Sequence, residues 1–169
     1  MIDRIVSGAG RLDRAAVPLG GGPSVAERGA AGQMIFEDFI YFLLSEEDKT
    51  TQTSLEYWFR CLDMDGDGVL SLFELEYFYE EQQARLQAVA MESLSVCDTM
   101  CQVLDFVHPA QPYTVTLADL KQCKLAPLFF DTLFNLAKYI VRETKPPSAI
   151  REERARPKVS YVPRANARG

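Results

Sequence analysis

The amino-acid sequence predicts an all-α fold. Apolar side chains recur at three- and four-residue spacing in several separate segments, which is the period of an amphipathic helix. Hydrophobic residues make up 47% of the 169 residues, enough to fill one core of ordinary size and too many for a chain that is disordered throughout. Polar connectors and prolines separate the periodic segments, so we expect several helices joined by short connections.

The predicted helices follow one another from residue 36 onward. Their apolar periods cover 36–45, 54–62, 72–94, 98–107 and 129–141. Ser54 is the expected N-cap of the second helix, and the capping-box-like sequence Thr116–Asp119 predicts the start of a further short helix. We expect a break near Pro127 before the last helix, and the proline pair at 146–147 is expected to stop it.

Composition divides the chain into three parts. We expect residues 1–33 to be a helix remnant followed by a flexible Gly/Ala-rich segment. Residues 34–143 are expected to form an all-α domain, and residues 144–169 a flexible basic tail. No run of about 18 apolar residues is long enough to span a membrane. The residues up to Arg14 contain no apolar stretch of the kind found in secretory signals. These features predict an intracellular protein with no membrane partner.

The four cysteines are expected to be reduced thiols in such a compartment. They are Cys61, Cys97, Cys101 and Cys123. Cys97 and Cys101 share a helical face, but the chain has one histidine and no second cysteine pair, so the pattern favours small buried apolar residues over zinc ligands.

Charge is unevenly distributed along the chain. The net charge is −6, yet residues 34–81 carry 13 acidic and 2 basic residues, while residues 142–168 carry 8 basic and 3 acidic ones. An acidic balance argues against a general nucleic-acid binder. The acidic middle and the basic tail therefore need separate explanations, and the tail is expected to be solvated.

The twelve residues from Asp63 to Glu74 match every position of the EF-hand calcium loop. Calcium takes six to eight oxygen ligands, which alternate residues of a tight loop can supply. Gly68 at position 6 permits the sharp turn. The candidate ligands are the side chains of Asp63, Asp65 and Asp67, the carbonyl of Val69, Ser71, and both carboxylate oxygens of Glu74. The sequence therefore predicts one working calcium loop between two helices.

Two weaker copies of this unit flank the loop. A shift of 45 residues aligns its apolar positions with a second unit, in which Val115 matches Leu70 and Asp119 matches Glu74. His108 and Ala110 replace the first two aspartates there, so we expect a degenerate hand that pairs with the calcium hand through Val115 and Leu70. Residues 34–45 match the exiting half of a third, also degenerate, hand.

Several longer runs resemble the B-double-prime regulatory subunits of protein phosphatase 2A. They are SEEDK at 45–49, LEYWFRC at 55–61, ELEYFYEEQ at 74–82, LADLKQCKL at 117–125 and FDTLFNL at 130–136, with the calcium loop between them. The resemblance implies a calcium-binding regulatory subunit that bridges the scaffold and catalytic subunits and directs substrate choice. It carries over the same six ligand positions, and it implies a cytoplasmic location, with the nucleus and centrosome also allowed.

Two other classes of function compete with this one. An autonomous EF-hand sensor or buffer that binds amphipathic target helices would have two or more working loops and a methionine-rich groove. An enzyme would need a constellation around His108 or a phosphate loop, but Gly20-Gly21-Gly22 lacks the Gly-Lys-Ser/Thr that follows in such loops. We therefore expect no catalytic residues and no small-molecule substrate.

Aromatic residues around the loop are candidates for a docking surface. They are Tyr57, Phe73, Tyr77 and Tyr79, of which Tyr79 is also expected to pack in the core together with Phe78.

Overall fold

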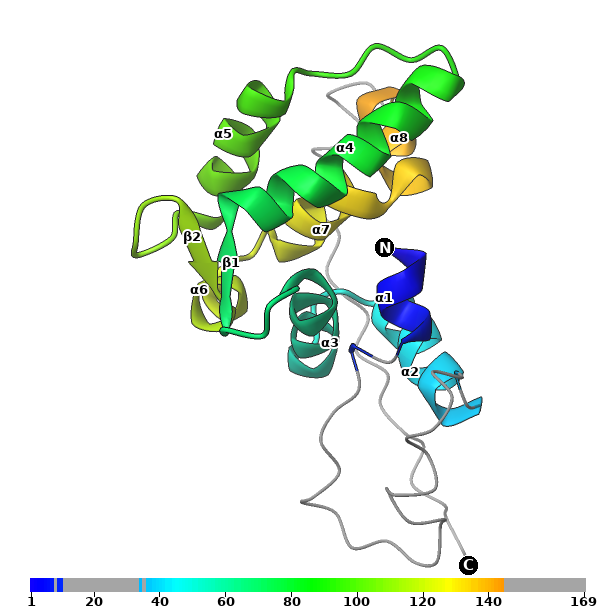
Figure 1. Ribbon diagram of the computed structural model, residues 1–169, viewed down its shortest axis with the longest axis vertical. Helices are drawn as coiled ribbons and strands as arrows, with labels where there is room; N and C mark the ends of the chain where they lie inside the picture. The colour runs from blue at the N-terminus through cyan, green and yellow to red at the C-terminus, as the bar shows by residue number, and fades with distance from the viewer. Residues whose placement is uncertain (8, 11–33, 35, 145–169) are drawn as a thin grey trace, which may run out of the picture. The chain divides into compact units, whose positions relative to one another are not determined.

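The structure, a computed structural model, describes residues 1–7, 9–10, 34 and 36–144 (Figure 1). The predictions for the remainder of the Gly/Ala-rich segment, for the stop at 146–147 and for the basic tail lie outside these residues. The chain divides into two units, Met1–Leu136 and Ala137–Gly169. The domain limits expected from composition stay a prediction.

Helices dominate the described residues, as the sequence predicts. The helices are α1 (Ile2–Val6), α2 (Phe36–Glu47), α3 (Gln52–Leu62), α4 (Leu72–Ala88), α5 (Val96–Val107), α6 (Leu117–Gln122), α7 (Ala126–Phe134) and α8 (Leu136–Thr144). Two three-residue strands, β1 (Val69–Ser71) and β2 (Thr114–Thr116), complete the elements.

The strands pair in the way that the internal repeat predicts. β1 and β2 run antiparallel and side by side, with Leu70 opposite Val115 (Figure 1). Both side chains are fully buried. The strands therefore join two helix–loop–helix units, α3–β1–α4 and α5–β2–α6, through one apolar pair.

The starts of α3 and α6 are set by side-chain caps. The N-cap of α3 is Thr51, whose hydroxyl accepts from the backbone N–H of Ser54, so the expected cap at Ser54 is wrong by about one turn. The predicted box at the start of α6 is confirmed: Thr116 Oγ1 accepts from Asp119 N, and the Asp119 carboxylate accepts from Thr116 N.

Three expectations about helix limits are wrong. α4 ends at Ala88 and not near residue 94, because the chain turns at Ala90, which has φ 55. The segment expected as one helix over 129–141 is two, α7 and α8, separated at Asn135. Pro127 lies in the first turn of α7, where its missing N–H costs no helix bond, so it is part of a helix start and not a break.

The core of the unit Met1–Leu136 lies among α3, α4, α5 and α7. Its largest fully buried side chains are Trp58, Phe78, Tyr79, Phe129 and Phe130. Burying each contributes about 1.5–3 kcal/mol. α4 and α5 both pack against α7, while α3 packs against α2 and α6. Trp58 also donates from Nε1 to the carbonyl of Ser45 at 2.8 Å, which fastens α2 to α3.

The cysteines follow the prediction only in part. Cys61 is buried, and burial raises the pKa of its thiol to about 12. Cys97 and Cys101 are exposed, so their expected burial is wrong. The reason is helical phase, since α5 turns a different face, with Met100 and Val103, toward the core. No helix in the described residues combines the length and apolarity needed to cross a membrane.

Candidate metal centre

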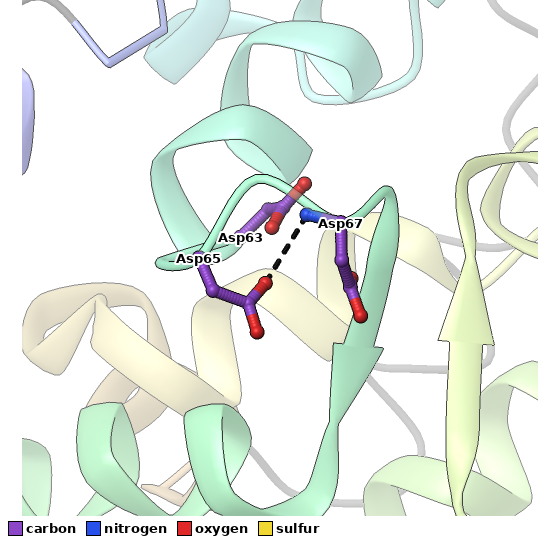
Figure 2. A group of neighbouring side chains, drawn as sticks. All are labelled: Asp63, Asp65 and Asp67. Atoms are coloured by element: carbon purple, nitrogen blue, oxygen red, sulfur yellow. Dashed lines mark hydrogen bonds between the residues drawn. The ribbon is translucent and has the colours of Figure 1, made fainter.

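Three aspartates come together in the loop between α3 and β1. Carboxylate oxygens of Asp63, Asp65 and Asp67 all lie within 4.8 Å of one another. Figure 2 shows the three side chains gathered on the turn that leaves α3. Asp63 is buried, at 8% exposure, and the other two are exposed. The structure thus brings together three of the residues that the sequence places at alternate positions of this loop.

Two glycines allow the loop to close around Asp63. Gly66 and Gly68 have φ values of 76 and 83, a region that residues with a Cβ avoid. Their backbone N–H groups donate to the two oxygens of Asp63, Gly66 to Oδ1 at 2.7 Å and Gly68 to Oδ2 at 3.1 Å. The first carboxylate of the loop is therefore oriented by the backbone that follows it.

The next two carboxylates are oriented in the same way. Asp65 Oδ1 accepts from Asp67 N at 3.1 Å, the contact dashed in Figure 2, and Asp67 Oδ1 accepts from Val69 N at 2.8 Å. Each of these bonds uses Oδ1. The backbone thus fixes where the aspartates point before any ion is considered.

Glu74 ties the end of the loop to its start. It is 3% exposed in the first turn of α4. Its Oε1 accepts from Met64 N at 2.6 Å, and its Oε2 accepts from the backbone N and the hydroxyl of Ser71 at 2.8 and 2.9 Å. The group of oxygens within 4.8 Å is made of the three aspartates and does not include Glu74.

The residue types fit a hard divalent cation. Four carboxylates lie on one twelve-residue loop, and two of them, on Asp63 and Glu74, are buried. A buried carboxylate is costly unless it is paired or bound to a cation, and oxygen ligands of this kind are those that calcium prefers. The donor set contains no sulfur or imidazole, which argues against zinc.

The second loop has no comparable group. In the described part of the chain, the cluster formed by the three aspartates is the one set of three acidic, histidine or cysteine side chains placed to hold an ion. The Asp119 carboxylate instead accepts from Ala110 N at 3.3 Å and from Thr116 N at 2.9 Å. His108, at the C-cap of α5, adopts a left-handed conformation with φ 50.

The four aromatic residues that are candidates for a docking surface differ in their exposure to solvent. Phe73 and Tyr77 lie one turn apart on α4 and are 71% and 53% exposed. Tyr57 and Tyr79 are buried, so they are not part of an exposed surface. Core packing is confirmed for Phe78 and Tyr79.

Sequence reasoning missed one residue at the loop. The guanidinium of Arg4, in α1, donates to the carbonyl oxygen of Asp63. No local signal could have indicated this contact, because the two residues are 59 positions apart.

Comparison with known proteins gives the family. The chain is 53% identical over 145 residues to the human B'' beta regulatory subunit of serine/threonine-protein phosphatase 2A, covering 86% of this chain and 23% of that protein. It is 54% identical to the mouse B'' delta regulatory subunit over the same share of this chain and 27% of that protein. A probable B'' epsilon regulatory subunit of Arabidopsis thaliana is 44% identical over 129 residues. No family model matches the chain.

A solved structure agrees with the sequence comparison. It is described as a PP2A PR70 holoenzyme and carries the label "diCa", that is, with calcium. Its matching chain is 50% identical, with a TM-score of 0.68, over 83% of this chain and 46% of that one. The chain spans 23% of the human B'' beta subunit, 11% of the human B'' alpha subunit and 27% of the mouse B'' delta subunit, that is, about a quarter or less of these curated relatives. Over the part that it spans, the chain belongs to the B'' family of protein phosphatase 2A regulatory subunits.

Proposed function

We propose that this chain is a calcium-binding regulatory component of the protein phosphatase 2A holoenzyme. It bridges the scaffold and catalytic subunits, directs substrate choice and performs no chemistry of its own. The observation that carries the proposal is the 50% identity and TM-score of 0.68 with a chain of the PR70 holoenzyme. A protein with this role acts inside the cell, and we place it in the cytoplasm.

The fold we propose is an EF-hand pair with one working calcium loop. The proposed ligands are Asp63, Asp65, Asp67, the carbonyl of Val69, Ser71 and Glu74. The convergence of the three aspartates and the burial of Glu74 support this set. The pairing of Leu70 with Val115 supports a shared core with a degenerate hand, in which Asp119 takes the place of Glu74.

In this proposal calcium supplies two positive charges, and the residues of the chain respond by a change in the angle between α3 and α4. The loop begins at the C-terminal end of α3 and ends in the first turn of α4. Oxygens from both ends therefore meet one ion, which sets the angle between these two helices. The angle can bias docking only if its two settings differ in calcium affinity. The exposed side chain of Phe73 comes directly before Glu74, so a change in the angle between α3 and α4 would move it.

The test is calcium titration by calorimetry of the full chain and its Glu74→Gln variant. We expect the wild type to bind with a dissociation constant on the order of 10⁻⁷ to 10⁻⁵ M, and Glu74→Gln to weaken binding strongly. Glu80→Gln, an exposed change on the same helix, is the matched control and is expected to bind as the wild type does. Absence of any calcium heat in the wild type would contradict the loop assignment.

Assembly is tested separately, with purified scaffold subunit and with the scaffold–catalytic dimer. We expect association of the wild-type chain in calcium and weaker association in a chelator. Calcium binding without association in either buffer would reject the holoenzyme role and favour an autonomous sensor.

A further inference from the structure

The N-terminal helix α1 is fastened to the end of α3 from which the calcium loop departs. The Arg4 guanidinium donates from Nε to the carbonyl of Cys61 at 3.1 Å and from Nη2 to the carbonyl of Arg60 at 3.1 Å. It also donates to the carbonyl of Asp63. One side chain thus joins three carbonyls at the end of a helix that lies 56 to 59 residues further along the chain.

Two of these carbonyls, on Arg60 and Cys61, lie in the last turn of α3, and the third is on its C-cap, Asp63. The last carbonyls of a helix have no intrahelical donor, and the helix dipole places partial negative charge there. A planar guanidinium satisfies several of them at once, with a geometry that an ammonium cannot reproduce. Arg4 is therefore a cap for the C-terminal end of α3, supplied from a distant element.

The cap acts directly on the first residue of the loop. Asp63 donates its backbone N–H to the carbonyl of Phe59 at 2.9 Å, and its own carbonyl accepts from Arg4. Both peptide groups that flank this residue are thereby held. The side chain that opens the calcium loop thus departs from a fixed backbone position.

A second contact places the N-terminal segment independently of Arg4. Gly10 is buried against the ring of Tyr57 on α3, so closely that a Cβ at Gly10 would lie 2.5 Å from Cε2. Ile5 packs against the core cluster. The N-terminal segment therefore contacts α3 both at the end that carries the loop and one to two turns before it.

We propose that Arg4 is a positioning residue for the calcium loop, so that docking of α1 on α3 and calcium binding strengthen each other. This rests on the calcium site of the proposed function. Ordering the start of the loop in advance removes part of the entropy cost that calcium would otherwise meet. Because coupling between two sites is reciprocal, calcium must in turn stabilise the docked helix.

A competing effect has the opposite sign. The positive charge of Arg4 repels a cation, which would weaken calcium binding. Arg4→Lys separates the two effects, because it keeps the charge and loses the planar fork. If positioning dominates, Arg4→Lys weakens binding; if repulsion dominates, Arg4→Lys leaves binding unchanged and Arg4→Gln tightens it.

The experiment is calcium calorimetry on the full chain, the two Arg4 variants and Asp3→Asn, an exposed change on the same helix. We expect both Arg4 variants to weaken binding about three- to tenfold, the scale of one or two lost hydrogen bonds. Asp3→Asn is expected to bind as the wild type does. Gly10→Val, which displaces the segment without touching Arg4, is expected to weaken binding in the same direction.

Amide hydrogen exchange gives a readout on the unmodified chain. The backbone N–H groups of Ser7 and Ala9 donate to carbonyls of α1, so their exchange reports whether α1 is formed. A helix of five residues is marginal in water on its own, so its formation depends on docking. We expect calcium to slow both in the wild type and neither in Glu74→Gln. Unchanged exchange, or wild-type affinity in Arg4→Lys, overturns the inference and leaves the calcium site standing. A wild type that binds no calcium overturns both.

Discussion

At the scale of single residues, two carboxylates in equivalent positions close the two loops by related means. Glu74 and Asp119 each lie three residues after the N-cap of an exiting helix and form a capping box with it. Each also reaches back into its own loop, Glu74 to Met64 N and Asp119 to Ala110 N. The second loop is thus closed by hydrogen bonds to one carboxylate, which explains how it keeps the shape of a hand without ion ligands.

Asp119→Ala is expected to destabilise the fold, whether or not calcium is present. Burial alone would raise the pKa of Asp119, but hydrogen bonds from the Thr116 hydroxyl, Thr116 N and Ala110 N outweigh it and hold the pKa below its usual 3.8. The ionised form therefore stabilises the folded state. This contribution is present above pH 3.8 and is lost as the pH falls through the lower pKa of the folded state.

Urea unfolding measures this contribution. We expect Asp119→Ala to lower the free energy of unfolding by about 1 kcal/mol at pH 7, and the difference from the wild type to shrink below pH 3.8. Asp105→Ala, an exposed change on α5, is the control. If the difference in unfolding free energy persists at low pH, or appears only with calcium, then the ionised Asp119 carboxylate does not stabilise the second loop independently of metal.

At the scale of elements, a buried cation holds the connection between α2 and α3 against α7. Lys49 is 3% exposed, with Nζ 2.6 Å from Glu46 Oε2 and 2.9 Å from Asp131 Oδ1. The same ammonium lies 5.3 Å from the ring centroid of Trp58 and 5.6 Å from that of Phe134. Two anions and two aromatic faces thus surround one charge, which compensates for its removal from water.

Lys49→Met is expected to cost about 3 kcal/mol of unfolding free energy, because it leaves carboxylates in a buried site without their cation. Chemical denaturation measures the loss. Lys121→Met is the matched control, since Lys121 pairs with Glu56 at 2.6 Å but both side chains are about a third exposed. That change is expected to cost less than about 1 kcal/mol. Equal losses of unfolding free energy in the two variants would contradict the stabilising role of the buried Lys49 ion pairs.

Elements are predictable from the sequence where their causes are local. Apolar period and capping boxes are local, and they correctly indicate most helices and the start of α6. The end of α4 is not local: Tyr79 and Gln83 donate to the carbonyl of Leu94, which holds the returning chain against the helix it has left. No sequence pattern near Ala88 indicates that contact, so the apolar period alone predicts a helix that is too long.

The candidate site divides in the same way. The aspartates of the loop lie at fixed spacing within a few residues, so their convergence follows from the motif. The contacts of Arg4 with the end of α3 and of Gly10 with Tyr57 depend on how the first ten residues dock on α3, which sequence spacing does not reveal. The expected burial of Cys97 and Cys101 is wrong because a shared helical face does not specify which face meets the core.

At the scale of the whole molecule, the acidic charge has a specific use in the proposed function. Residues 34–81 hold 13 acidic residues, and four of them belong to the proposed calcium loop. These four carboxylates repel one another in the folded chain, and two of them are buried. A bound divalent ion offsets this repulsion only in the folded state, because the unfolded chain does not gather the ligands. Calcium binding should therefore raise the free energy of unfolding of the whole domain.

The expected gain follows from linkage. At a calcium concentration of about one hundred times the dissociation constant, binding to the folded state alone adds roughly 2.7 kcal/mol. For a domain of this size, that gain raises the midpoint of thermal unfolding by on the order of 10 °C, as measured by circular dichroism. Glu74→Gln should show little of the shift. Potassium chloride at matched ionic strength separates binding from screening, since screening would stabilise both chains alike. An equal rise in wild type and Glu74→Gln, or an equal rise in potassium chloride, would mean that general charge and not a calcium loop governs the stability of the acidic region.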